Sequence, residues 1–206
     1  MKLVTTSVVR GSYQGESHGG VYLIDLEKRE VRQTLDWNKA DIDWQGRGRD
    51  RGLRGIAFDG EIVYIAASDE LFAYTPDFEL LGSWRNQYLK HCHEIAVWER
   101  RLFLTSTGFD SILGFDLDRR EFSWAMHVAS HEFRFKGVTF DPRGNDGPLM
   151  LNKLHINKHR PHTIEELEEW EGLNFDLMKM DITAQQIEDL ALEIVEGAKA
   201  QQALPK

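Results

Sequence analysis

Residues 53–84 read LRGIAFDGEIVYIAASDELFAYTPDFELLGSW, and the pattern returns at residues 93–124 as HEIAVWERRLFLTSTGFDSILGFDLDRREFSW. Trp84 of the first copy corresponds to Trp124 of the second, 40 residues later (124 − 84). Each copy contains four short runs of β-branched, aromatic and aliphatic residues, separated by turns rich in Asp, Gly, Pro or charged residues. A period of about 40 residues with four strands per unit is typical of a β-propeller blade. We therefore predict a mainly β fold.

An incomplete copy of the pattern precedes these two. Residues 20–26 match residues 111–117 at a constant distance of 91 (111 − 20), and both segments continue into a charged turn. Residues 1–37 are therefore predicted to form a blade that lacks its innermost strand. Asp25 and Asp116 stand at the same place in the two copies and are expected to cap the strand end or the following turn.

The period is lost after the last complete copy. We predict complete blades at residues 53–84 and 93–126, and an irregular or partial blade at residues 127–157. Within the partial blade, residues 137–140 are the probable strand. Residues 151–157 are a candidate inner strand of a fourth blade.

Residues 1–157 are thus predicted to form a partial β-propeller of about three four-stranded blades, and residues 163–206 an acidic α-helical tail. The tail contains 11 acidic and 3 basic residues, a net charge of −8. Apolar residues recur at helical spacing along one face of residues 183–204. A closed ring has about four to eight blades, so we expect the chain to form a homo-oligomer or to dock a partner protein through the 183–204 helix.

Composition excludes several classes of protein. The formal net charge of −9 argues against binding to nucleic acid or to an anionic membrane. The single cysteine, Cys92, rules out an intrachain disulfide. We expect neither a signal peptide nor a membrane span, and we expect a cytoplasmic location.

Three tryptophans, Trp37, Trp84 and Trp124, stand where the successive copies end. Large aromatic side chains at repeating positions usually pack between elements of the core. We interpret them as core between blades rather than as a ligand cage.

An arginine-rich segment leads directly into the first strand of the 53–84 copy. Its candidate ligand-binding residues are Arg47, Arg49, Arg51 and Arg54. Guanidinium groups bind carboxylate or phosphate through forked, charge-assisted hydrogen bonds. The alternative interpretation is a solvated loop whose arginines pair with acidic residues elsewhere in the chain.

A second candidate segment is His91-Cys92-His93-Glu94. Two imidazoles two residues apart on an extended chain can bind a transition metal such as zinc, and the third ligand would come from His155 or His159. Glu94 replaces Gly55 of the preceding copy, so it serves as a metal ligand, a general base or a cap of a backbone amide. The alternative for the histidines is a hydrogen-bonded surface role.

Five segments also carry a resemblance to known proteins: DRGLRGIAFDG, SDELFAY, HCHEIAV, LTSTGFDSILGFDL and LHIN. They resemble a group of uncharacterised bacterial propeller proteins, broadly like the six-bladed propellers of the NHL, YVTN and gluconolactonase/paraoxonase type. The resemblance covers about residues 8–157. It implies a calcium ion held at the centre of the ring by inner-strand side chains, where Glu94 and Asn157 occupy comparable positions.

Two hypotheses of function follow. The favoured one is a propeller-type binding and assembly module that binds a small anion at the arginine-rich segment. The alternative is a metal-dependent hydrolase or lactonase with calcium or zinc. In that enzyme Glu94, Asn157, His91 and His93 would be the metal ligands, and Glu94, His93 and His155 the catalytic candidates.

Overall fold

The strands of this protein form three antiparallel sheets. The computed structural model describes residues 1–13, 16–37, 52–131 and 134–156. In these ranges the only helical element is one 3-10 turn, Thr107–Phe109, and no helix is long and apolar enough to cross a membrane. The prediction of a mainly β fold is confirmed. The predicted helical tail, residues 163–206, lies outside the described residues.

The first sheet has three strands in the order β1-β2-β3: β1 (Lys2–Thr6), β2 (Gly20–Asp25) and β3 (Glu30–Asp36). The turn after β2 is capped by Asp25, whose Oδ1 accepts the backbone N–H groups of Glu27 and Lys28 at 3.0 and 3.1 Å. Asp116 caps the equivalent turn in the third sheet in the same way. The predicted role of both aspartates is therefore confirmed.

The second sheet has four strands in sequence order: β4 (Ile56–Asp59), β5 (Ile62–Ala67), β6 (Glu70–Tyr74) and β7 (Leu80–Arg85). Every residue of β6 and nearly every residue of β5 is buried. These two strands read as almost continuous apolar runs because both faces of this sheet are covered.

The third sheet has five strands: β8 (Ile95–Trp98), β9 (Arg101–Ser106), β10 (Ser111–Asp116), β11 (Glu121–His131) and β12 (Arg134–Phe140). The predicted end of this blade at residue 126 differs from the structure. Strand β11 continues to His131, and all of β12 pairs with residues 125–131 of β11. The sequence suggested irregular structure here because residues 127–131 read HVASH, without a strong apolar pattern.

The candidate inner strand at residues 151–157 is not a strand in its described part, residues 151–156. Asn152 and His155 both have left-handed backbone conformations, with φ of 48° and 53°. An extended strand cannot pass through such residues. The segment instead lies against the turn that joins β9 to β10, where Gly108 O accepts the Asn152 N–H at 3.2 Å. The three sheets therefore have three, four and five strands. The described residues contain no strand of a fourth sheet.

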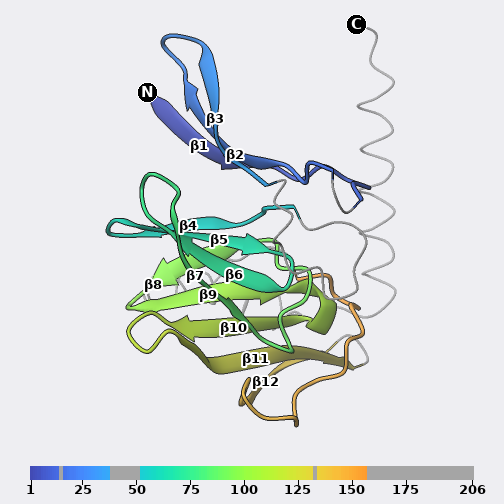
Figure 1. Ribbon diagram of the computed structural model, residues 1–206. Coiled ribbons are helices and arrows are strands. Elements are labelled where there is room, and N and C mark those ends of the chain that lie inside the picture. The colour runs from blue at the N-terminus through green and yellow to red at the C-terminus, as the bar shows by residue number, and fades with distance from the viewer. Residues whose placement is uncertain (14–15, 38–51, 132–133, 157–206) are drawn as a thin grey trace, which may run out of the picture. The chain divides into compact units, whose positions relative to one another are not determined.

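The second sheet lies between the other two, as Figure 1 shows, and a hydrophobic cluster fills each interface. On one side Trp37, which follows β3, meets Phe72 of β6 edge to face with ring centroids 4.9 Å apart. On the other side Trp84 of β7 meets Phe115 of β10 at 5.0 Å. These two tryptophans lie between sheets, as predicted. Consecutive antiparallel sheets packed face to face make the arrangement propeller-like.

Candidate functional site

Arg54 and His93 hold the same place in two successive sheets, immediately before β4 and β8. They are 39 residues apart (93 − 54), which is the repeat distance of the inner strands. Gly55 allows the two strand starts to approach, since a Cβ at this position would lie 2.8 Å from the backbone nitrogen of Ile95. The approach brings Arg54 Nη1 to 3.0 Å from His93 Nδ1. The structure thus joins two segments that the sequence suggested only as separate candidates.

The backbone at His93 is held by Thr105 of β9. Thr105 Oγ1 accepts the N–H groups of His93 and Glu94 at 3.2 and 3.1 Å and donates to Glu94 O at 3.3 Å. Thr105 is fully buried. Sequence reasoning missed it, although it stands where the preceding copy has Ala66, and a hydroxyl replacing a methyl group at a core position was the available signal.

His155 is brought to the same place by Asp110. The carboxylate of this buried residue accepts three successive backbone N–H groups, those of Lys153, Leu154 and His155, at 2.6, 3.0 and 2.9 Å. The segment is also tied at Thr107, whose Oγ1 donates to Ile156 O at 2.7 Å. As a result the His155 ring lies 5.7 Å from the His93 ring, centroid to centroid, at an interplanar angle of 60°.

The surroundings of His93 are basic. The pKa of His93 is lowered to about 4, first by burial and then by the nearby groups Arg54, His155, His91 and Arg10. His93 is therefore neutral at pH 7. Arg54 Nη1 lies 3.0 Å from His93 Nδ1 and 3.5 Å from His93 Nε2. Because a guanidinium can only donate, the imidazole is the acceptor in this contact. The charge of Arg54 suits an anionic partner.

The remaining predicted site residues divide into two groups. Arg47, Arg49, Arg51 and Asn157 lie outside the described residues. Glu94 is half-buried, and within the described part of the chain no hydrogen bond involves its carboxylate. Its hydrogen bonds with Thr105 are made by its backbone N–H and C=O groups. His91 has φ of 55°, so the chain is not extended there and His91 does not alternate with His93 along a strand.

A metal site at this position stays a prediction. Among the residues that the structure describes, no three His, Cys, Asp or Glu side chains are grouped so as to hold a metal ion. The predicted ligand Asn157 is not among them. Glu94, His91 and His93 are the members of the predicted ligand set whose positions are described.

Cys92 is a core residue. Its side chain is completely buried and its N–H donates to Ser68 O at 2.7 Å. Burial raises the pKa of Cys92 to about 12, and this outweighs the lowering by Thr105 and Arg54. A thiol with such a pKa is a poor nucleophile at pH 7.

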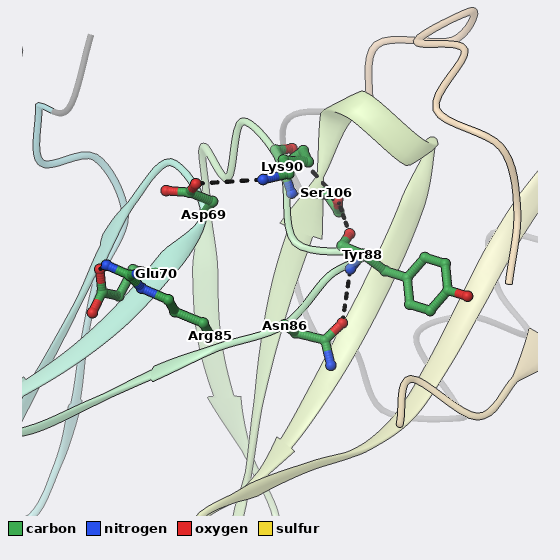
Figure 2. A network of polar contacts seen from close by, with 7 residues as sticks. All are labelled: Asp69, Glu70, Arg85, Asn86, Tyr88, Lys90 and Ser106. Atoms are coloured by element: carbon green, nitrogen blue, oxygen red, sulfur yellow. Dashed lines mark hydrogen bonds and ion pairs between the residues drawn. The ribbon is translucent and has the colours of Figure 1, made fainter. Parts of the chain in front are cut away.

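A second polar cluster, which sequence reasoning did not identify, lies where β6 begins and β7 ends (Figure 2). Lys90 Nζ lies 3.4 Å from Asp69 Oδ2, and Arg85 Nη2 lies 2.7 Å from Glu70 Oε2. Both carboxylates are almost fully buried, and each has a basic partner. A polar pocket of about 170 Å³ opens beside them. Balanced ion pairs of this kind hold the 85–92 connection to the second sheet.

Comparison with known proteins assigns no family. No family model matches the chain, and no curated protein matches it. Among solved structures, a chain of a nidogen/laminin complex aligns at 12% identity with a TM-score of 0.41, over 61% of this chain and 43% of that one. Myxococcus xanthus glutaminyl cyclase aligns at 18% identity with a TM-score of 0.33, over 62% of this chain and 55% of that one.

Saccharomyces cerevisiae Sqt1 aligns at 10% identity with a TM-score of 0.40, over 64% of this chain and 38% of that one. This chain thus covers less than two thirds of the length of each of the three solved structures. Similarity at these TM-scores assigns neither a fold nor a function.

Proposed function

We propose that this chain is a propeller-type binding and assembly module that holds a small anion, a carboxylate or phosphate group, at Arg54, His93 and His155. The observation that carries the proposal is the convergence of these three basic side chains from three separate segments: Arg54 Nη1 lies 3.0 Å from His93 Nδ1, and the rings of His93 and His155 are 5.7 Å apart. An anion held there would face hydrogen-bond donors from more than one segment of the chain.

The framework favours a fixed site over a solvated surface. Two buried polar side chains, Thr105 and Asp110, hold the backbones of His93 and His155 through five hydrogen bonds from N–H groups. Pre-organised donors lose little conformational entropy when a ligand binds. Arg47, Arg49 and Arg51 precede Arg54 in sequence but lie outside the described residues, and their part in anion binding stays a prediction.

The test is a calorimetric titration of inorganic phosphate and, separately, of citrate into the full chain at low ionic strength. Arg54→Met should weaken binding of both anions about tenfold or more, because a hydrogen bond to a charged group contributes about 1.5–3 kcal/mol. Arg143→Met is the matched control, since Arg143 is an exposed arginine already engaged by Asp141. Equal affinities for wild type and Arg54→Met, or no binding of either anion, would contradict the proposal.

A pH series with sulfate, whose charge is constant between pH 4 and 7, tests the role of His93. A bound anion favours the charged form of His93, so its pKa should rise above about 4 in the complex. Affinity should therefore increase as the pH falls through that raised value. His93→Gln should reduce this increase, and an increase of the same size in wild type and His93→Gln would exclude His93 from the site.

A further inference from the structure

The two interfaces between sheets repeat one arrangement. The tryptophan at the end of one sheet packs against an aromatic residue on the third-strand position of the next sheet. Trp37 meets Phe72 of β6, and Trp84 meets Phe115, which lies on the corresponding face of β10. Each internal interface thus joins the back face of one sheet, which carries the tryptophan, to the front face of the next.

The third sheet repeats the back face without a described sheet to cover it. Trp124 of β11 lies on the same face as Trp84 of β7, shifted by two residues in register, since Trp84 pairs with Leu71 and Trp124 pairs with Gly114, the counterpart of Ala73. Trp124 lies over Gly114 and beside Phe103, with ring centroids 5.8 Å apart. Ile112 and Met126 are register partners on the same face. All of these side chains are only half-buried, and none belongs to either hydrophobic cluster of the described residues.

The first sheet repeats the front face in the same way. At the distance of 91 residues, Tyr22 and Ile24 correspond to Leu113 and Phe115, which are fully buried against the second sheet. Tyr22 and Ile24 are only half-buried. The register places Leu3, Ile24 and Val31 side by side on that face, with Leu3 45% and Val31 66% exposed.

We propose that a second copy of this chain covers the third sheet, with the front face of its first sheet (Leu3, Tyr22, Ile24, Val31) packed on the back face (Phe103, Ile112, Trp124, Met126). A second copy is the expected partner because the same kind of contact already occurs twice inside the chain. A back face packs on a front face where the first sheet meets the second, and again where the second meets the third. An isolated sheet face of this composition is otherwise an aggregation hazard.

Such a contact is heterologous, so it closes into a ring or continues as a filament according to the rotation between copies. The inference rests on the assembly part of the proposed function. It assigns the contact between copies to the faces of two sheets instead of the predicted 183–204 helix.

The experiment is native mass spectrometry of the full chain with two variants, Ile24→Asp on the front face and Ile112→Asp on the back face. Wild type should be larger than a monomer, either a ring or a filament, and each variant alone should be a monomer, since every contact in a one-variant sample contains one altered face. An equimolar mixture should form a one-to-one heterodimer through the unaltered back face of Ile24→Asp and the unaltered front face of Ile112→Asp. Far-UV circular dichroism checks folding, and Met126→Lys replaces Ile112→Asp if the latter does not fold.

A monomeric wild type would overturn the inference. So would an oligomer that persists in either variant, or a mixture that remains monomeric although both variants are folded. Ile194→Asp, in the predicted helix, should leave the oligomer intact, and dissociation by this variant alone would move the interface to the helix. Phosphate titration of the monomeric Ile24→Asp variant separates the two proposals, because loss of assembly with retained anion binding leaves the anion site in place.

Discussion

The second and third sheets come from two copies of one sequence pattern, yet equivalent positions serve different purposes. At the strand start, Arg54 of one copy donates to its counterpart His93 in the other. At the following position the second sheet has Gly55, which lets the neighbouring backbone approach, and the third sheet has the half-buried Glu94. The repeat therefore conserves where a residue is placed, and the neighbouring element decides what that residue does.

The aspartates at the second turn of each copy show the same divergence. Asp69 and Asp110 are 41 residues apart (110 − 69), and both are buried. Asp69 pairs with the side chain of Lys90, whereas Asp110 holds the backbone of residues 153–155. In both sheets the following segment folds back onto this turn, and the two aspartates differ in what they bind there: a lysine side chain for Asp69 and backbone N–H groups for Asp110.

The largest expected effect is a difference in stability loss between the front face of the third sheet, which the second sheet covers, and its back face. Phe115→Ala should lower the free energy of unfolding by about 3–5 kcal/mol, because Phe115 is fully buried and contacts Trp84 and Phe122. Trp124→Ala, on the open face, should cost less than half as much. Urea denaturation of both variants in the monomeric Ile24→Asp background measures the difference. Similar losses would mean that the face of Trp124 is covered within one chain.

The next largest effect is a difference in stability loss between substitutions of Asp110 and Asp69. Asp110→Ala should lower the free energy of unfolding by about 3 kcal/mol, since removal of a charged acceptor leaves three backbone N–H groups without it. Asp69→Ala should cost less, because the Lys90 side chain reaches solvent. Urea denaturation compares the two variants. Asp110→Asn, which keeps one oxygen acceptor, should lie between Asp110→Ala and wild type.

Phosphate titration of the same variants adds a second readout. Asp110→Ala should also weaken phosphate binding, because it releases the segment that carries His155. Asp69→Ala should leave phosphate affinity unchanged. An Asp110→Ala variant with normal phosphate affinity would remove His155 from the site.

The smallest effect concerns pH and distinguishes His93 from Arg54. The folded-state pKa of His93, about 4, lies below its ordinary value of 6.5, so the unfolded chain binds more protons between these values. This contribution to stability is fully present above about pH 6.5 and is lost as the pH falls toward about 4. Because His93 is partly exposed, solvent screening reduces it to on the order of 1 kcal/mol.

Urea denaturation from pH 7 to 4 measures this dependence. His93→Gln should flatten the profile over this window. Arg54→Met should flatten it only in part, because burial, which this variant leaves in place, is the largest cause of the low pKa. A profile that is identical in wild type and His93→Gln would contradict the assignment.

Much of the fold follows from the sequence, and the limits have physical causes. The period of about 40 residues predicts where strands β4 to β10 lie, because alternation and turn residues are local properties. The partner of β12 was not predictable, since strand pairing depends on segments that meet in space. For the site, the shared offset placed Arg54 and His93 at equivalent positions, but nothing local indicated their contact. Thr105 and Asp110 act through backbone groups of other segments, so they carry no motif.

By itself, the sequence determined the β class, the repeated unit and the capped turns at Asp25 and Asp116. Each of these depends on residues close together in the chain or on composition. The tertiary structure alone decided that Arg54, His93 and His155 share one place, and that Trp84 and Trp124 differ in their surroundings. The physical reason is that burial and charge at a position are set by the elements packed against it, and a repeat whose last copy has no described sheet beyond it places identical residues in different environments.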